Sequence, residues 1–171
     1  MRNTLTIAIA VLAIGTAACG RKQAAPEPVP PAEQVPPGET VAPGDVELVE
    51  LPAAQADLVA KAGSDTVYFG TDEYALDAAS QATLAAQARW LIANPNVRAS
   101  IEGHCDERGT REYNMALGER RANAARDFLL SQGVPAARLL VTSWGKERPV
   151  APGSNEEAWA QNRRAVTVLV R

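Results

Sequence analysis

Residues 97–114 carry the clearest local signals of structure, with alternating apolar and polar residues followed by a mostly polar run: Val97-Arg98-Ala99-Ser100-Ile101-Glu102-Gly103-His104-Cys105-Asp106-Glu107-Arg108-Gly109-Thr110-Arg111-Glu112-Tyr113-Asn114. The alternation over 97–102 predicts a half-buried strand. Residues 103–109 are mostly polar and begin and end with glycine, which predicts a loop. A helix is expected from about Thr110 to Gln132, because Gly133 is placed to end it and Pro135 follows.

The same succession of strand and helix extends on both sides of this stretch. In chain order, we expect a strand over 66–69, a helix from about 77 to 94, the strand over 97–102, the helix over 110–132, a strand over 139–144, a short helix opened by the capping-box spacing of 154–157, and a strand over 165–170. Asp77 is expected to cap the first helix. Helical crossovers make strands parallel, and a short return adds an antiparallel strand. The sequence therefore predicts an α/β fold, a two-layer sandwich in the order β-α-β-α-β-(short α)-β, with a mixed sheet and helices on one face.

Composition argues against several classes of protein. The 171 residues carry a net charge of −3 and contain one histidine and two cysteines. A single histidine makes a His-based zinc site improbable, so neither a metal nor a cofactor is expected, and two cysteines cannot build a disulfide-rich scaffold. The net charge gives no reason to expect nucleic-acid binding. The one long apolar run lies within the first twenty residues, which argues against a polytopic membrane protein.

The first residues form a predicted export signal. A basic start precedes an apolar core from Leu5 to Ile14, and small residues lead to Cys19. This pattern resembles a bacterial lipoprotein signal, which implies removal of residues 1–18 and acylation of Cys19. An ordinary secretion signal with a chance cysteine is the alternative. By resemblance to bacterial sorting rules, Gly20 favours the outer membrane, with the rest of the chain facing the periplasm.

Residues 19–64 differ in composition from the rest of the chain. Eight of the twelve prolines lie between Pro26 and Pro52, and the apolar residues are too interrupted to bury a core. We expect a disordered, proline-rich tether that begins at the lipidated Cys19 and leads to a folded domain over 65–171. Acylation of Cys19 leaves Cys105 without a partner, and Cys105 is interpreted as a small, partly buried side chain.

Polar residues of the central loop and helix suit a small zwitterion. Asn114, Leu117 and Arg121 are spaced by three and four and share one helical face, and Asp106 lies in the loop before them. Asp106 can pair with an ammonium group, and Arg121 can hold a carboxylate with its planar fork. Two alternatives stay open at this point: the two side chains pair with each other, or the charges form a solvated face. The core stripe beside this face is expected to contain three residues: Tyr113, Ala124 and Phe128.

The polar stretch resembles the signature of the OmpA-like peptidoglycan-binding domain, and more narrowly that of the outer-membrane lipoproteins of the Tol system. The resemblance covers 65–171 and rests on Val67-Tyr68-Phe69, Glu102-Gly103-His104, Asp106-Glu107-Arg108-Gly109-Thr110, Glu112-Tyr113-Asn114, Leu117-Gly118-Glu119-Arg120-Arg121-Ala122-Asn123-Ala124, Gly145-Lys146-Glu147 and Asn162-Arg163-Arg164-Ala165-Val166.

This resemblance implies an outer-membrane lipoprotein that binds peptidoglycan non-covalently through the meso-diaminopimelate of the stem peptide. Such a protein tethers the outer membrane to the cell wall and belongs to the Tol system of envelope integrity and cell division. The second partner that the resemblance implies is the Tol system's periplasmic propeller protein, TolB. A module that binds this protein with little direct wall contact is the alternative.

The resemblance also implies roles for single residues. Asp106 matches the family's acid for the diaminopimelate ammonium, and Arg121 matches its base for the carboxylate. Asn114 is expected to order the loop.

Three further positions are expected to build the wall of the pocket. The resemblance implies that backbone donors near Asp72 and Leu117 complete the cradle for the carboxylate. Thr71 stands where many relatives carry an aromatic residue.

An enzyme of wall hydrolysis is the competing class, and the sequence argues against it. A zinc amidase needs several metal ligands, and His104 is the single histidine. A glycosidase needs two acids that flank a sugar. Two of the candidate acids do not suit this role, because Glu102 is expected on a strand face and Asp106 is assigned to binding.

Overall fold

The computed structural model describes residues 50–171, which include the whole predicted domain. Its elements in chain order are α1 (Pro52–Ala62), β1 (Thr66–Tyr68), α2 (Ala78–Ala93), β2 (Arg98–His104), α3 (Arg111–Ser131), a 3-10 turn (Ala136–Arg138), β3 (Leu139–Gly145), α4 (Glu156–Asn162) and β4 (Arg164–Val170). The predicted signal peptide, the acylated Cys19 and the first part of the tether lie outside the described residues.

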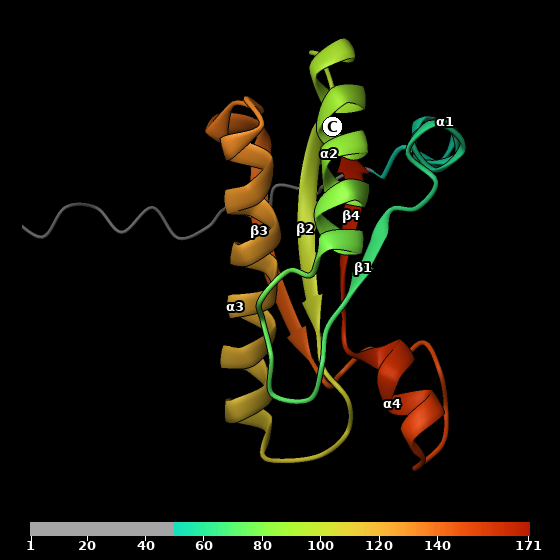
Figure 1. Ribbon diagram of the computed structural model, residues 1–171, viewed down its shortest axis with the longest axis vertical. Coiled ribbons are helices and arrows are strands. Elements are labelled where there is room, and N and C mark those ends of the chain that lie inside the picture. Colours follow the sequence, from blue (N-terminus) through green and yellow to red (C-terminus); the bar gives the residue numbers. More distant parts are fainter. Residues whose placement is uncertain (1–49) are drawn as a thin grey trace, which may run out of the picture. The chain divides into compact units, whose positions relative to one another are not determined.

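The strands form one mixed sheet, in agreement with the predicted α/β fold. Its order is β1-β4-β2-β3, with β2 and β3 parallel and β4 antiparallel to both of its neighbours. Figure 1 shows α2 and α3 side by side on one face of the sheet. The helical crossover through α3 makes β2 and β3 parallel, and the tight return through α4 turns β4 around between β1 and β2.

Local capping signals set the helix ends. The Asp77 carboxylate accepts a hydrogen bond from the Ser80 backbone N–H at 2.7 Å, which confirms it as the cap of α2. Gly133 follows the end of α3 with φ of 96°, a conformation that glycine adopts without strain. The cap of α4 is Asn155, one residue beyond the start of the predicted capping box.

The folded domain begins earlier than the sequence predicted. Residues 52–62, assigned to the disordered tether over 19–64, form α1, and Glu50 already pairs with Val170 of β4. Leu58 of α1 is fully buried in the core. The Gln55 amide donates to the Thr167 carbonyl and accepts from the Leu169 N–H, both at 2.8 Å. The alanine-rich sequence of 52–62, with proline at its first position and Gly63 after its end, favours a helix, and the buried leucine and these hydrogen bonds hold that helix against β4.

α3 lies unusually close to β2 because two glycines face each other. A Cβ atom at Gly103 of β2 would overlap the carbonyl of Gly118 in α3. Small residues at the contact let the helix backbone approach the sheet, so the start of α3 sits beside the loop that follows β2. This approach brings the residues of the predicted site together.

The buried face of α3 differs from the predicted one. Tyr113, expected in the core stripe, is 43% exposed, and Ala124 and Phe128 are only partly buried. The face turned to the sheet contains the three helical residues assigned to ligand binding, and its buried residues are Asn114, Leu117, Gly118, Arg121, Ala122, Ala125 and Leu129. The small residues at 118, 122 and 125 decide the rotation of the helix, because only that face permits the close approach to β2.

No helix within residues 50–171 combines the length and the apolar character that crossing a bilayer requires.

The contact between the two glycines predicts a large effect of one methyl group. Gly103→Ala should lower the free energy of unfolding by about 1–3 kcal/mol or more, because the new Cβ forces α3 away from β2. Urea denaturation measures this loss. Gly70→Ala is the matched control, since its Cβ meets only the movable carboxylate of Glu73. Equal stability of the two variants would contradict the assignment of Gly103 as the contact point.

Candidate functional site

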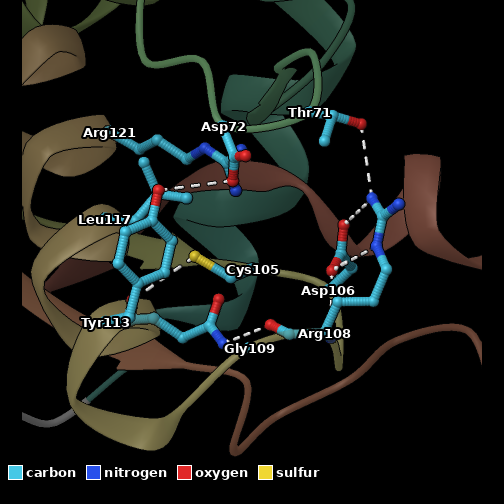
Figure 2. Close-up of a pocket in the computed structure, with 10 residues that line it drawn as sticks. Thr71, Asp72, Cys105, Asp106, Arg108, Gly109, Tyr113, Leu117 and Arg121 are labelled. Atoms are coloured by element: carbon cyan, nitrogen blue, oxygen red, sulfur yellow. Dashed lines mark hydrogen bonds and ion pairs between the residues drawn. The ribbon is translucent and has the colours of Figure 1, made fainter.

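A pocket of about 270 Å³ opens where the β1–α2 loop, the β2–α3 loop and the first turns of α3 meet (Figure 2). Six of its lining residues are those predicted from the sequence: Thr71, Asp72, Asp106, Asn114, Leu117 and Arg121. Four others had no assigned part in binding: Cys105, Arg108, Gly109 and Tyr113. The structure thus brings the predicted residues to one place, and their part in binding stays a prediction.

Arg121 is buried at the inner end of the pocket, with 1% of its surface exposed. Its guanidinium donates three hydrogen bonds to backbone carbonyls, from Nε to Glu73 at 2.8 Å and from the two terminal nitrogens to His104 and Gly70 at 2.9 Å each. These acceptors carry no net charge, and within residues 50–171 no carboxylate oxygen forms an ion pair with Arg121. A guanidinium has five N–H donors, so two remain.

The electrostatics of Arg121 favour an anion in the pocket. Burial lowers the pKa of its guanidinium, yet arginine stays charged at neutral pH. The charges of Asp106 and Asp72, which line the same pocket, act on Arg121 from a distance and form no ion pair with it. A buried cation without a directly paired anion is costly for the fold. The carboxylate of a ligand would supply a direct partner, and the planar fork can bind it with two parallel hydrogen bonds.

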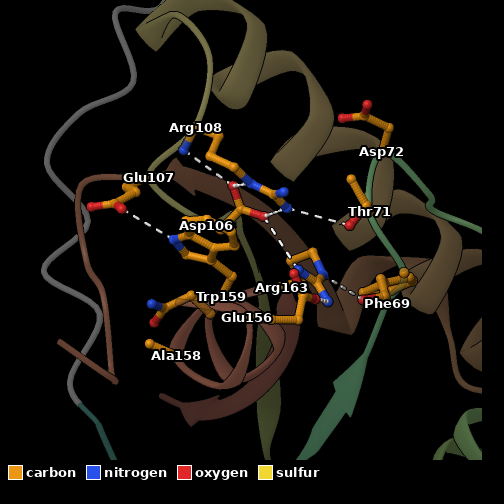
Figure 3. A network of polar contacts seen from close by, with 12 residues as sticks. Phe69, Thr71, Asp72, Asp106, Glu107, Arg108, Glu156, Ala158, Trp159 and Arg163 are labelled. Carbon is orange, nitrogen blue, oxygen red and sulfur yellow. Dashed lines mark hydrogen bonds and ion pairs between the residues drawn. The ribbon is translucent and has the colours of Figure 1, made fainter. Parts of the chain in front are cut away.

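Asp106 lies on the opposite side of the pocket and is 7% exposed. Its Oδ1 accepts from the Arg108 backbone N–H and from Arg108 Nε, both at 3.1 Å. Its Oδ2 accepts from Arg108 Nη2 at 2.6 Å and from Arg163 Nη1 at 3.5 Å (Figure 3). The open alternative in which Asp106 pairs with Arg121 therefore does not describe this structure.

The carboxyl group of Asp106 is ionised at neutral pH. Burial alone would raise its pKa, but the hydrogen bonds and the charge of Arg108 outweigh burial and hold the pKa below the ordinary value. The pocket therefore presents a carboxylate and a guanidinium from separate segments of the chain.

Asn114 has the position expected of a residue that orders the loop. Its side-chain amide donates to the carbonyls of Arg108 at 2.6 Å and Thr110 at 3.0 Å, and it is 2% exposed. Leu117 lies in the interior of α3, so its N–H belongs to the helical ladder. Leu117 offers an apolar side chain to the pocket, in place of the backbone donor expected there.

The β1–α2 loop closes the other side of the pocket. Asp72 is the one non-glycine residue of the described chain with positive φ, at 57°. Its carboxylate accepts from the Tyr113 hydroxyl at 3.3 Å, and the Thr71 hydroxyl accepts from Arg108 Nη2 at 3.3 Å. Figure 2 shows both contacts, one on each side of the pocket. The loop thus rests on side chains from α3 and from the β2–α3 loop.

Two residues of the C-terminal segment support the site and had no assigned ligand role. Arg163 donates to the Phe69 carbonyl at 3.1 Å and to Glu156 at 2.7 Å, besides its contact with Asp106. The ring of Trp159 lies 4.3 Å from the Arg108 guanidinium carbon. Sequence spacing carries no signal for these contacts, because α4 follows the loop by about 50 residues.

The adjacent His104 and Cys105 are unsuited to nucleophilic chemistry. Burial, followed by the charges of Arg164 and Arg148, lowers the pKa of His104 to about 3. Burial raises the pKa of the Cys105 thiol, which donates to the Asn114 carbonyl at 3.4 Å. A neutral thiol is a poor nucleophile, so Cys105 acts as a packed side chain.

Comparison with known proteins agrees with the fold and the sequence signature. The model of the OmpA family matches residues 68–163. The peptidoglycan-associated lipoprotein of Agrobacterium fabrum is 55% identical over 118 residues, which cover 69% of this chain and 66% of that protein. The one from Pseudomonas aeruginosa is 50% identical over 109 residues, 64% of each chain. The match to the Agrobacterium protein thus spans just under two thirds of its length.

Solved structures show the same domain. The crystal structure of the peptidoglycan-associated lipoprotein from Burkholderia pseudomallei is 46% identical, with a TM-score of 0.61, and the match covers 63% of this chain and 91% of that one. The C-terminal domain of Helicobacter pylori MotB is 21% identical with a TM-score of 0.57, covers 61% and 83%, and shows the fold alone. Sequence, fold and relatives agree with the predicted resemblance, and the chain belongs to the OmpA family.

Proposed function

We propose that this protein is an outer-membrane lipoprotein that binds peptidoglycan non-covalently by holding the diaminopimelate of the stem peptide in the pocket described above. The observation that carries the proposal is Arg121, a fully buried guanidinium that lines a pocket and has only carbonyl acceptors. Such a group has no direct ion-pair partner, and the carboxylate of a ligand can take that place. The role is binding and not catalysis.

The chemistry of diaminopimelate matches the two charges of the pocket. Its side chain ends in an ammonium and a carboxylate on the same carbon. The carboxylate would take the remaining N–H donors of Arg121, and the ammonium would face Asp106. Lysine, which replaces diaminopimelate in some walls, has the amine without this carboxylate and leaves Arg121 uncompensated.

The names of the relatives support a wall-associated role, since several at 50–55% identity are called peptidoglycan-associated lipoproteins. We infer that Cys19 carries the lipid and that the segment after it tethers the domain to the outer membrane.

Charge-assisted hydrogen bonds contribute about 1.5–3 kcal/mol each, which gives modest affinity for one site. Many identical sites on the wall and a tethered domain raise the effective concentration, so reversible binding suffices.

A second candidate function is docking of the Tol system's periplasmic propeller protein, TolB. Tyr74 and Tyr113 are 51% and 43% exposed, and the Arg120 guanidinium lies 5.8 Å from the Tyr74 ring. Exposed tyrosine and arginine are enriched at protein interfaces. Tyr113 lines the pocket, so this surface overlaps the wall site, and both functions are compatible with one domain.

Asp106→Asn should weaken co-sedimentation with purified diaminopimelate-type sacculi by about tenfold or more. The variant leaves Arg108, Arg121 and Arg163 around the ligand's ammonium without the nearby carboxylate, so the ammonium is repelled. Asp127→Asn, at an exposed acid of α3, is the control and should bind as the wild type does. Undiminished binding of a folded Asp106→Asn protein, with folding checked by circular dichroism, would refute the role of Asp106.

A change in the ligand tests Arg121 without disturbing the fold. A stem peptide whose distal diaminopimelate carboxylate is converted to the amide should bind about tenfold or more weakly by calorimetry, because the neutral amide cannot compensate the buried guanidinium. Amidation of the peptide's terminal carboxylate is the control and should have little effect. If both amides bind as tightly as the parent peptide, the pocket does not recognise the diaminopimelate head.

The proposed anchor has its own test. Cys19→Ser should move the protein from the membrane fraction to the soluble periplasmic fraction, because the serine hydroxyl cannot receive the thioether-linked lipid. Immunoblotting of fractionated cells measures the shift. Cys105→Ser is the matched control, since the Cys105 thiol is buried in the domain. Membrane retention of Cys19→Ser would argue against acylation.

A further inference from the structure

The carboxylate of Asp106 has no free acceptor position in the structure. A carboxylate offers about four lone-pair sites on two oxygens. Oδ1 accepts from the backbone N–H and the Nε of Arg108, and Oδ2 accepts from Nη2 of Arg108 and Nη1 of Arg163. A ligand ammonium can therefore reach Asp106 only if one of these donors leaves.

The four donors differ in their freedom to move. The backbone N–H is fixed by the loop, whose Arg108 carbonyl is bound by Asn114. The Arg163 side chain is 8% exposed and is held by the Phe69 carbonyl and by Glu156. The Arg108 side chain is 39% exposed, and its other contacts are a 3.3 Å hydrogen bond to Thr71 and the face of Trp159. Arg108 is thus the donor with the most room to move, because its side chain can turn into solvent, whereas Arg163 is enclosed.

The position of the Arg108 guanidinium is that of a bound cation. It contacts both oxygens of Asp106 and rests on the Trp159 ring, as Figure 3 shows. Trp159 is in turn held by a 3.0 Å hydrogen bond from its indole N–H to Glu107. A cation over an aromatic face gains further attraction. The ion pair with Asp106 and the stacking on Trp159 both stabilise the Arg108 guanidinium in this position, compared with a side chain that extends into solvent.

We propose that Arg108 determines the specificity of the pocket by occupying the ammonium position at Asp106, so that the ligand binds through an exchange of one cation for another. The proposal rests on the function proposed above. The incoming ammonium takes the place of the Arg108 guanidinium, and the number of positive charges around Asp106 stays the same. The carboxylate position at Arg121 involves no such exchange, because the acceptors of Arg121 are carbonyls that need not move.

This exchange reduces what the ligand's amine contributes to affinity. The apparent affinity is the intrinsic affinity multiplied by the fraction of molecules in which Arg108 has withdrawn. A ligand with only the distal carboxylate uses Arg121 and does not meet this cost. The wild-type pocket therefore distinguishes a zwitterionic head from an anionic one less strongly than its charges alone would allow.

A two-by-two binding experiment tests the proposal. The proteins are the wild type and Arg108→Gln, and the ligands are the diaminopimelate stem peptide and the same peptide with 2-aminopimelate attached through its amino-acid end, which lacks the distal amine. Calorimetry should show that Arg108→Gln binds the diaminopimelate peptide about 3- to 10-fold more tightly than the wild type. The affinity for the 2-aminopimelate peptide should not change.

A matched variant separates the exchange from the simple loss of a positive charge. Arg111→Gln removes an exposed arginine at the start of α3 that pairs with Glu147 and does not line the pocket. It should leave both affinities at their wild-type values. An equal gain for Arg111→Gln and Arg108→Gln would overturn the proposal, because it would show an effect of net charge.

The remaining outcomes are also decisive. Weaker or unchanged binding of the diaminopimelate peptide by Arg108→Gln would contradict the exchange, and weaker binding would show that Arg108 contacts the ligand directly. A change of the same size for both peptides would show that Arg108 shapes the pocket without competing for Asp106. Failure of the wild type to bind either peptide would instead refute the proposed function itself.

Discussion

The arrangement of the pocket depends on one buried side chain. The guanidinium of Arg121 joins the carbonyl of His104 at the end of β2 to the carbonyls of Gly70 and Glu73 in the β1–α2 loop. These segments are far apart in the sequence, and a single planar group on α3 fixes their spacing. Because the acceptors are neutral, the charge of Arg121 is held in place without being neutralised. The same interaction that organises the loop therefore also leaves a cation for a ligand.

Much of the fold could be predicted because its signals are local. The cap at Asp77, the glycine at 133 and the alternation over 97–102 each act within a few residues, and the structure has the cap, the helix end and a strand at these places. The strand is buried on both faces, with Ser100 only 2% exposed, because β2 lies inside the sheet, so the half-buried strand that the alternation predicted was wrong in this respect. The rotation of α3 could not be predicted in the same way. Its pattern of apolar and small residues allows two faces, and the choice depends on the contact of Gly118 with Gly103 across the sheet. That contact exists only in the folded protein.

The residues of the candidate site also fall into two groups, those close together in the sequence and those that only the tertiary fold brings in. Asp106, Asn114 and Arg121 lie within sixteen residues of one another, so a loop followed by a helix brings them together, and the sequence could indicate them. Trp159 of α4 and Arg163, the residue directly after α4, reach the site from a segment whose position follows from the whole sheet topology. The early start of the domain was missed for a different reason. Residues 52–63 carry local helix signals, with Pro52 at the first helical position, several alanines and Gly63 after the last turn, but the proline-rich segment before them was extended over them. Contacts with β4, at the opposite end of the sequence, then hold α1 on the domain.

The pairing of Glu50 with Val170 has a mechanical consequence. β2 runs from Arg98, beside Val170, to His104, which precedes the pocket residues Cys105 and Asp106. The chain therefore enters the domain at one end of the sheet, and the pocket lies at the other, about 20 Å away. Under the function proposed above, a tensile load between the membrane and the bound wall would run parallel to the strands. The backbone hydrogen bonds between neighbouring strands are roughly perpendicular to that direction. The load therefore acts on many of them at the same time and does not break them one after another. Shear loading of this kind makes a small domain resistant to extension.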